Sequence, residues 1–188
     1  MIRIAVFASG SGTNAENLIN YFNHSNLAKI HLILTNNSKA GVIERAKKLN
    51  VPCEIFSKEE FLKGEQILKI LNAEGIDFIV LAGFLLLVSQ NVIDSYKDKI
   101  INVHPALLPL HGGKGFYGNR VHKAVKESGT IISGITIHKV NSKFDEGEII
   151  FQAACHVDKN ETEESLAQKI HSLEYKYFPI VIEKIISN

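Results

Sequence analysis

The stretch MIRIAVFASGSGTNA, residues 1–15, decides the fold class. Residues 2–8 are mostly apolar and β-branched, which is typical of a strand buried on both faces of a parallel sheet. The Ser-Gly-Ser-Gly segment at 9–12 ends this strand, and residues 13–22 have helical character. A strand, a glycine turn and a helix in this order predict the first βα unit of an α/β sheet.

The same alternation continues along the chain. Further strands are expected at residues 30–34, 52–56, 77–82 and 100–103, with helices at 42–49, 59–74 and 92–96. Two later strand-like runs, 131–140 and 148–157, flank a possible loop and follow a helix near 120–128. We therefore expect one α/β domain of residues 1–188 with a Rossmann-like, mostly parallel twisted sheet, helices on both faces and antiparallel C-terminal additions. A long C-terminal helix is expected at 162–187, which Pro179 should kink or interrupt.

Composition excludes several classes of protein. Of the 188 residues, 45% are hydrophobic and 22% charged, with a net charge of +1, so neither disorder nor an electrostatic grip on nucleic acid or membrane is expected. The longest apolar run, 78–88, is too short to span a bilayer. Cys53 and Cys155 lie far apart, which favours reduced thiols over a disulfide or zinc site. The N-terminus leads directly into a strand without a signal-peptide pattern, so a cytoplasmic location is expected.

The glycine turn suits a phosphate group. Glycines let the backbone approach a ligand, and the free N–H groups at the following helix start attract an anion. Gly10, Gly12 and Ala15 also fit the dinucleotide fingerprint, but the second strand ends in Thr-Asn-Asn, residues 35–37, without the acid that would bind a ribose. We favour a smaller phosphate ester over a dinucleotide. The alternative is a plain turn with a capping box between Thr13 and Glu16.

The segment Asn102-Val-His104-Pro105 ends a predicted strand. Side chains two apart share a face, so Asn102 and His104 should point the same way at the carboxyl edge of the sheet, where such folds bind ligands. An amide N–H and an imidazolium suit a negative charge that develops on a carbonyl oxygen. The alternative is a turn-capping asparagine and a buried, hydrogen-bonded histidine. A carboxylate is needed to hold the imidazole, and Asp145 lies in a predicted loop, but periodicity does not place it.

Five motifs follow one another along almost the whole chain. They are Ser9-Gly-Ser-Gly-Thr-Asn14, Leu81-Ala-Gly-Phe84, Asn102-Val-His-Pro-Ala-Leu-Leu-Pro109, Gly134-Ile-Thr-Ile-His138 and Asp145-Glu-Gly-Glu-Ile-Ile150. Together they resemble the folate-dependent formyltransferases, and the Asn-x-His-Pro-x-Leu-Leu-Pro run is the most specific of them.

This resemblance implies roles for particular residues. Asn102, His104 and Asp145 are the implied catalytic residues, and Gly12, Thr13 and Asn14 would hold the substrate phosphate. The implied set near the acceptor substrate is Pro109, His171, Ser172, Leu173 and Glu174. The implied folate-binding set is Lys58, Leu85, Leu86, Leu87, Val88, Asn102, Asn141, Ser142, Lys143, Phe144 and Asp145. The phosphate-binding half would span about 1–100 and the folate and catalytic half about 101–188.

The resemblance also implies a reaction. The donor would be 10-formyltetrahydrofolate as a co-substrate, and the acceptor the amine of 5′-phosphoribosylglycinamide in purine synthesis. The partners would be these small molecules alone, without nucleic acid, membrane or metal, and the protein would be a monomer or homodimer. The other histidines are expected at the surface or in packing, namely His111, His122, His138 and His156, and His138 is the one expected to lie nearest the site.

Two segments depart from the family pattern. Leu86 stands where the family often has an arginine that faces the folate tail. Residues 111–118, His-Gly-Gly-Lys-Gly-Phe-Tyr-Gly, replace a shorter turn and are either a mobile lid or a surface loop without a role in the chemistry.

Other functions remain open at this level. A methionyl-tRNA formyltransferase would add a nucleic-acid-binding domain and an arginine-rich turn, and a formyltetrahydrofolate hydrolase usually adds a regulatory domain, so we expect neither. A nucleotide-sugar formyltransferase would share the three catalytic residues. A non-catalytic nucleotide-sensing module on the same fold is the alternative from a different class.

Overall fold

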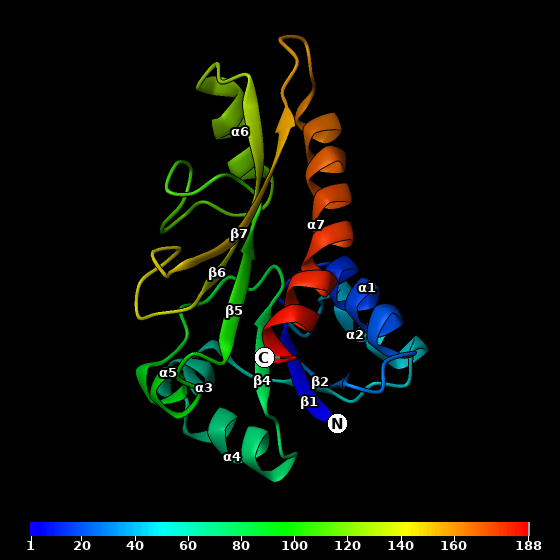
Figure 1. The fold of residues 1–188 in the computed structure, drawn as a ribbon. Coiled ribbons are helices and arrows are strands. Elements are labelled where there is room, and N and C mark those ends of the chain that lie inside the picture. Colours follow the sequence, from blue (N-terminus) through cyan, green and yellow to red (C-terminus); the bar gives the residue numbers. More distant parts are fainter. Residues whose placement is uncertain (188) are drawn as a thin grey trace.

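Seven strands form one sheet in the order β3-β2-β1-β4-β5-β6-β7 in the computed structural model, which describes residues 1–187 (Figure 1). The strands are β1 (Ile2–Phe7), β2 (Ala28–Thr35), β3 (Cys53–Ile55), β4 (Phe78–Leu81), β5 (Ile100–His104), β6 (Ile132–Lys139) and β7 (Ile149–His156). The first five pair in parallel, whereas β6 pairs antiparallel with both β5 and β7. The predicted fold class is confirmed.

Helices cover both faces of this sheet (Figure 1). They are α1 (Thr13–Phe22), α2 (Gly41–Lys48), α3 (Lys58–Lys63), α4 (Glu65–Ala73), α5 (Gln90–Ser95), α6 (Asn119–Glu127) and α7 (Glu163–Ile186). Each face has its own core because alternate residues of a buried strand point to opposite sides. On β1, Ile4 and Val6 belong to the core cluster that includes residues of α1, α2, α6 and α7, whereas Ala5 and Phe7 belong to the cluster with residues of α3, α4 and α5.

The helix predicted at 59–74 is wrong, because Gly64 divides it into α3 and α4. Gly64 has a positive φ of 72° and serves as both the C-cap of α3 and the N-cap of α4. A Cβ at this position would lie 2.2 Å from side-chain atoms of Ser89 and Asn91. The close approach of the first turn of α5 and its N-cap, together with the positive φ, therefore favours glycine here.

Pro179 does not interrupt the C-terminal helix, which runs unbroken through α7. A proline leaves the carbonyl four residues earlier without its helical partner. Here the carbonyl of Tyr175 accepts a hydrogen bond of 3.0 Å from the Asn17 side chain on α1. The contact replaces the missing helical bond and joins α7 to α1.

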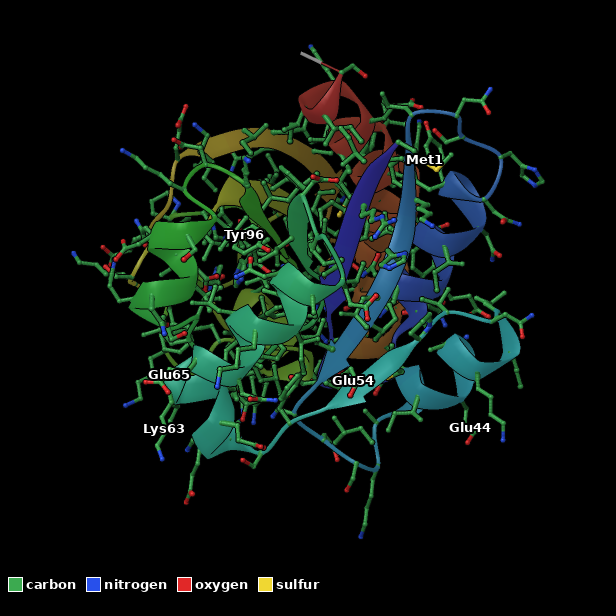
Figure 2. All side chains as sticks on the ribbon, turned by 90° about the horizontal axis from the view of Figure 1, so that it is seen from below. Met1, Glu44, Glu54, Lys63, Glu65 and Tyr96 are labelled. Carbon is green, nitrogen blue, oxygen red and sulfur yellow. The ribbon has the colours of Figure 1, made fainter. Side chains whose placement is uncertain are left out.

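The strand order creates the site. The connections of β1 and β4 leave the sheet in opposite directions, and a crevice forms at such a switch point beyond the carboxyl ends of the strands. Charged side chains such as Glu44 and Lys63 project outward from the rest of the molecule, whereas Tyr96 lies in the interior (Figure 2). Within residues 1–187, no helix combines the length and apolar character needed to cross a bilayer.

Candidate active site

The β1–α1 loop presents the start of α1 to the crevice. Gly12 is the N-cap, with φ at 77°, and no side chain caps the helix. The capping box considered between Thr13 and Glu16 does not form, because the Glu16 carboxylate pairs with Arg45 instead. Since the first N–H groups of a helix have no partner within it, this end of α1 is open to an anion.

Hydrogen bonds from three directions hold this loop. The Ser9 hydroxyl donates to Asn36 over 2.6 Å and accepts from the Leu85 backbone over 3.0 Å. The Asn37 amide donates to the Ser9 carbonyl over 3.2 Å. Arg45 donates to the Ser11 carbonyl over 2.9 Å. The asparagines after β2, which stand where a dinucleotide-binding unit has its acid, therefore shape the loop.

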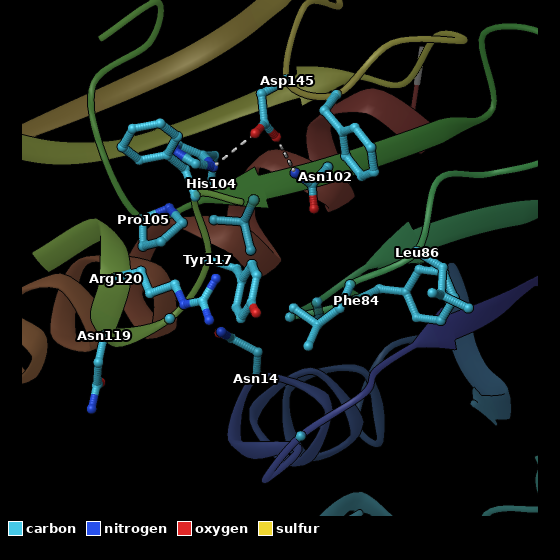
Figure 3. A pocket seen from close by; sticks show the side chains of 18 of the residues that line it. Asn14, Phe84, Leu86, Asn102, His104, Pro105, Tyr117, Asn119, Arg120 and Asp145 are labelled. Atoms are coloured by element: carbon cyan, nitrogen blue, oxygen red, sulfur yellow. Dashed lines mark hydrogen bonds and ion pairs between the residues drawn. The ribbon is translucent and has the colours of Figure 1, made fainter. Parts of the chain in front are cut away.

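Asn102, His104 and Asp145 meet at the carboxyl end of β5 (Figure 3). The amide nitrogen of Asn102 lies 3.5 Å from Asp145 Oδ1, and His104 Nδ1 lies 3.5 Å from Asp145 Oδ2. His104 Nε2 lies 2.8 Å from the backbone carbonyl of His111. Because both ring nitrogens of His104 face oxygen acceptors, the arrangement suits a doubly protonated imidazolium.

Asp145 reaches the cluster from the loop between β6 and β7. Its φ is 56°, and its side chain is only 12% exposed. Burial disfavours its charged form, but contacts with the His104 and His138 rings and a hydrogen bond of 2.9 Å from the Gly113 N–H outweigh burial and hold the Asp145 pKa well below its usual range. The carboxylate is therefore charged beside His104.

The cluster forms one wall of a cavity of about 750 Å³, and the β1–α1 loop forms another. Figure 3 shows Asn14 and the Asn102–His104–Asp145 cluster on different sides of this space. On the substrate side, Glu174 from α7 is buried and accepts hydrogen bonds from Asn14 over 2.8 Å and from His171 over 3.0 Å. The bond to Glu174 raises the pKa of His171.

A profile of the formyl transferase family matches residues 2–182 of the chain. The chain belongs to the formyl transferase family. It is 37% identical to chloroplastic phosphoribosylglycinamide formyltransferase of Arabidopsis thaliana, over 97% of this chain but only 65% of that relative's length. It is 34% identical to phosphoribosylglycinamide formyltransferase of Bacillus subtilis (strain 168), over 99% of this chain and 95% of that one.

Solved structures of the family share the fold. The crystal structure of glycinamide ribonucleotide transformylase 1 from Geobacillus kaustophilus superposes with a TM-score of 0.90 at 34% identity and covers 99% of both chains. That of phosphoribosylglycinamide formyltransferase from Bacillus halodurans gives 0.89 at 32% identity, over 99% of this chain and 96% of that one.

Most of the residues that the family resemblance implied line the cavities. The main cavity includes Gly12, Thr13, Asn14, Lys58, Leu85, Leu86, Leu87, Asn102, His104, Phe144, Asp145, His171 and Glu174. A smaller adjoining cavity of about 50 Å³ includes Leu86, Leu87, Val88, Asn102, Asn141, Lys143, Phe144 and Asp145. The assigned roles stay predictions, although the positions lie together.

Four of the implied residues do not line either cavity. Pro109 is exposed and follows a cis peptide bond after Leu108. The Ser172 hydroxyl donates to the backbone of α7, and Leu173 packs against the core. Ser142 lies in the β6–β7 loop outside both cavity walls. The roles assigned to these four residues also stay predictions.

Residues 113–120 form a further wall of the main cavity, and no binding role was predicted for their side chains. Gly113 to Arg120 all line the main cavity, so this glycine-rich segment faces the site, and its role as a lid stays a prediction. Arg120 lies over the Tyr117 ring, 4.8 Å from its centroid, and both point into the space in Figure 3. Aromatic residues between glycines were the signal in the sequence, but nothing local indicated which way they face.

His122 was expected at the surface or in packing, and it is both buried and part of the cavity wall. Burial and the nearby rings of His171 and His104 lower its pKa, although Glu174 opposes them. Its Nδ1 has no hydrogen-bond partner in the part of the chain that the structure describes.

Among residues 1–187, no cluster of three or more His, Cys, Asp or Glu could hold a metal ion.

Proposed function

We propose that this protein transfers the formyl group of 10-formyltetrahydrofolate to the amine of 5′-phosphoribosylglycinamide, giving formylglycinamide ribonucleotide and tetrahydrofolate. One observation carries the proposal. The Asn102–His104–Asp145 cluster and the open N-terminus of α1 face a single cavity. An acceptor with an amine at one end and a phosphate at the other fits such a cavity, and both relatives described above are phosphoribosylglycinamide formyltransferases.

The reaction makes one bond and breaks one. The amine nitrogen attacks the formyl carbon, and the bond between that carbon and the folate nitrogen then breaks. Negative charge develops on the formyl oxygen in between, and hydrogen-bond donors placed at that oxygen lower the barrier. Asn102 supplies an amide N–H, and protonated His104 supplies the second donor.

Proton transfer completes the balance. The amine loses one proton, and the leaving folate nitrogen gains one. Asp145 keeps His104 doubly protonated and, through a bound water, passes the amine proton to the leaving nitrogen. His104 Nε2 donates to the His111 carbonyl in this structure, so the formyl oxygen must take the place of that carbonyl.

The donor site is proposed where the smaller cavity joins the main one, since the two share Leu86, Phe144 and Asp145 and the smaller alone has only about 50 Å³. Leu86, Leu87, Val88 and Phe144 give it apolar walls, and Asn102, His138 and Asp145 add polar groups at one side. Flat heteroaromatic rings need this combination of apolar walls and a few directed polar atoms.

A purine-synthesis enzyme with the reduced thiols Cys53 and Cys155 is proposed to act in the cytoplasm.

The test is an acceptor panel. Purified protein is given 10-formyltetrahydrofolate with phosphoribosylglycinamide, its dephosphorylated riboside, an amino-sugar nucleotide, or no acceptor. Tetrahydrofolate release should be fastest with phosphoribosylglycinamide. Equal rates without an acceptor would indicate a hydrolase, a preference for the sugar nucleotide would indicate a different transferase, and no turnover with any acceptor would contradict an enzyme role.

His104→Ala links the activity to the site. Loss of a donor to the oxyanion should lower kcat about 100-fold or more. His156→Ala is the matched control, because its side chain is 65% exposed on β7 and outside the cavity. Circular dichroism and thermal unfolding should show that both variants fold. Full activity in folded His104→Ala would contradict the mechanism.

A further inference from the structure

His138 lies directly behind the catalytic amide and has no role in the reaction as described so far. It is only 2% exposed, on β6. In the antiparallel pairing of β5 with β6, His138 is the partner of Asn102, so their side chains share a face of the sheet. The β6–β7 register shifts between Ile137 and His138, and such irregularities often re-aim a side chain beside a functional site.

The tautomer of His138 follows from its backbone contact. His138 Nδ1 lies 2.8 Å from the carbonyl oxygen of Lys139. A carbonyl oxygen only accepts hydrogen bonds, so Nδ1 carries a proton, and in the neutral form of the ring Nε2 then has a free lone pair. Gly147 leaves room for this geometry, because a Cβ there would collide with the Lys139 carbonyl.

That lone pair determines how the Asn102 amide points. His138 Nε2 lies 3.0 Å from Asn102 Nδ2 but 3.6 Å from Asp145 Oδ1, so the close contact is with the amide. An acceptor at Nε2 requires the NH₂ group of Asn102 on this side. One N–H is then held by His138, and the second is held only loosely by Asp145, 3.5 Å away, and can turn to a substrate oxygen.

We infer that His138 is a positioning residue, which holds the Asn102 amide with its N–H groups, and not its oxygen, toward the developing oxyanion. The inference rests on the proposed formyl transfer. Without His138, the amide could rotate by half a turn and present Oδ1, an acceptor, to the negative charge. The Asn102 side chain would then repel the oxyanion where it now stabilises it. The energy of the transition state would rise more than the free energy of substrate binding would weaken.

Two substitutions separate positioning from simple packing. His138→Leu fills the space but removes the acceptor, and His138→Gln keeps an acceptor oxygen near the position of Nε2. We expect His138→Leu to lower kcat about 10- to 100-fold with both KM values within about twofold, and His138→Gln to recover most of that loss. Equal losses in both folded variants, or a kcat within twofold of wild type in His138→Leu, would overturn the inference.

A measurement on the wild-type protein is independent of turnover and of variant folding. Long-range ¹H–¹⁵N NMR of histidine-labelled protein at neutral pH should show His138 neutral, with its proton on Nδ1. A proton on Nε2, or on both nitrogens, would overturn the inference even if the enzyme is active. If the wild type transfers no formyl group, the proposed function fails by itself, and the NMR result still decides the orientation of the amide.

Discussion

Two loops enclose the cavity, and they are built differently. The β1–α1 loop, residues 8–12, is tied to β2, α2 and the segment after β4 by side-chain hydrogen bonds. The glycine-rich loop, residues 111–118, is attached to the site mainly by two contacts, from His104 to the His111 carbonyl and from the Gly113 N–H to Asp145. The first is held in place before any ligand binds and suits the proposed phosphate site, whereas the second is held by the proposed catalytic residues themselves.

The difference explains what each loop can do. A phosphate far from the reacting atoms needs a fixed site, because rigid placement reduces the entropy lost on binding. The wall above the reacting atoms must instead exchange partners, because the His111 carbonyl occupies the His104 donor that the oxyanion needs. The position of the glycine-rich loop therefore depends on its bonds to His104 and Asp145, whereas the β1–α1 loop makes no such bonds.

Asp145→Asn should have the largest effect on activity, and this effect should arise on the side of the glycine-rich loop. The imidazolium of His104 loses its counter-charge and the glycine-rich loop loses a charged acceptor, so kcat should fall about 100-fold or more, with the basic limb of the pH profile moved to lower pH. The KM for the phosphorylated acceptor should change little. Steady-state kinetics from pH 5 to 9 would check this, and unchanged turnover and pH dependence would remove Asp145 from the mechanism.

Asp145→Asn should also change how the free energy of unfolding depends on pH. The pKa of Asp145 in the folded protein is lower than the unfolded value of about 3.9, so its charged form stabilises the fold above that pH, and the contribution disappears as pH falls. The stability difference between wild type and Asp145→Asn in urea unfolding should narrow between pH 7 and pH 3. A constant difference would contradict this electrostatic account.

A pair of glycine substitutions compares the two loops directly. Gly12 and Gly113 both have positive φ, at 77° and 96°. A Cβ on Gly12 would lie 2.5 Å from the Val42 side chain, whereas one on Gly113 meets nothing within 4 Å. Gly12→Ala should cost about 2–4 kcal/mol of unfolding free energy, and Gly113→Ala about 1–2 kcal/mol from backbone strain alone. Equal costs in chemical denaturation would refute the stated difference in packing.

Asn14→Leu should produce the smallest effect, a change in KM that is confined to the ligand bound beside the β1–α1 loop. The variant removes the hydrogen bond to Glu174 and a polar group beside the proposed phosphate site. We expect KM for the phosphorylated acceptor to rise about tenfold, which corresponds to about 1.4 kcal/mol, while KM for the folate stays within twofold. An effect on the folate alone would show that the phosphate assignment is wrong.

Local sequence predicted the regular elements well where one pattern dominates. The helix at 13–22 was placed to the residue, and each predicted strand has a counterpart in the sheet. The single helix predicted across Gly64 was wrong, and Pro179 does not interrupt α7; in both places a partner distant in sequence decides the outcome. Asn91 and Ser89 impose the break at Gly64, and Asn17 supplies the bond that Pro179 leaves open. No local propensity contains these partners.

By itself, the sequence determined that β5 would end in an amide and an imidazole on the same face, because side chains alternate along any strand. It also determined that a glycine turn would precede α1. Only the tertiary structure brought Asp145 to His104, turned the glycine-rich loop inward and set His138 behind Asn102. Each of these contacts joins segments separated by many residues, and their meeting depends on sheet order and strand register, which are properties of the whole packed chain.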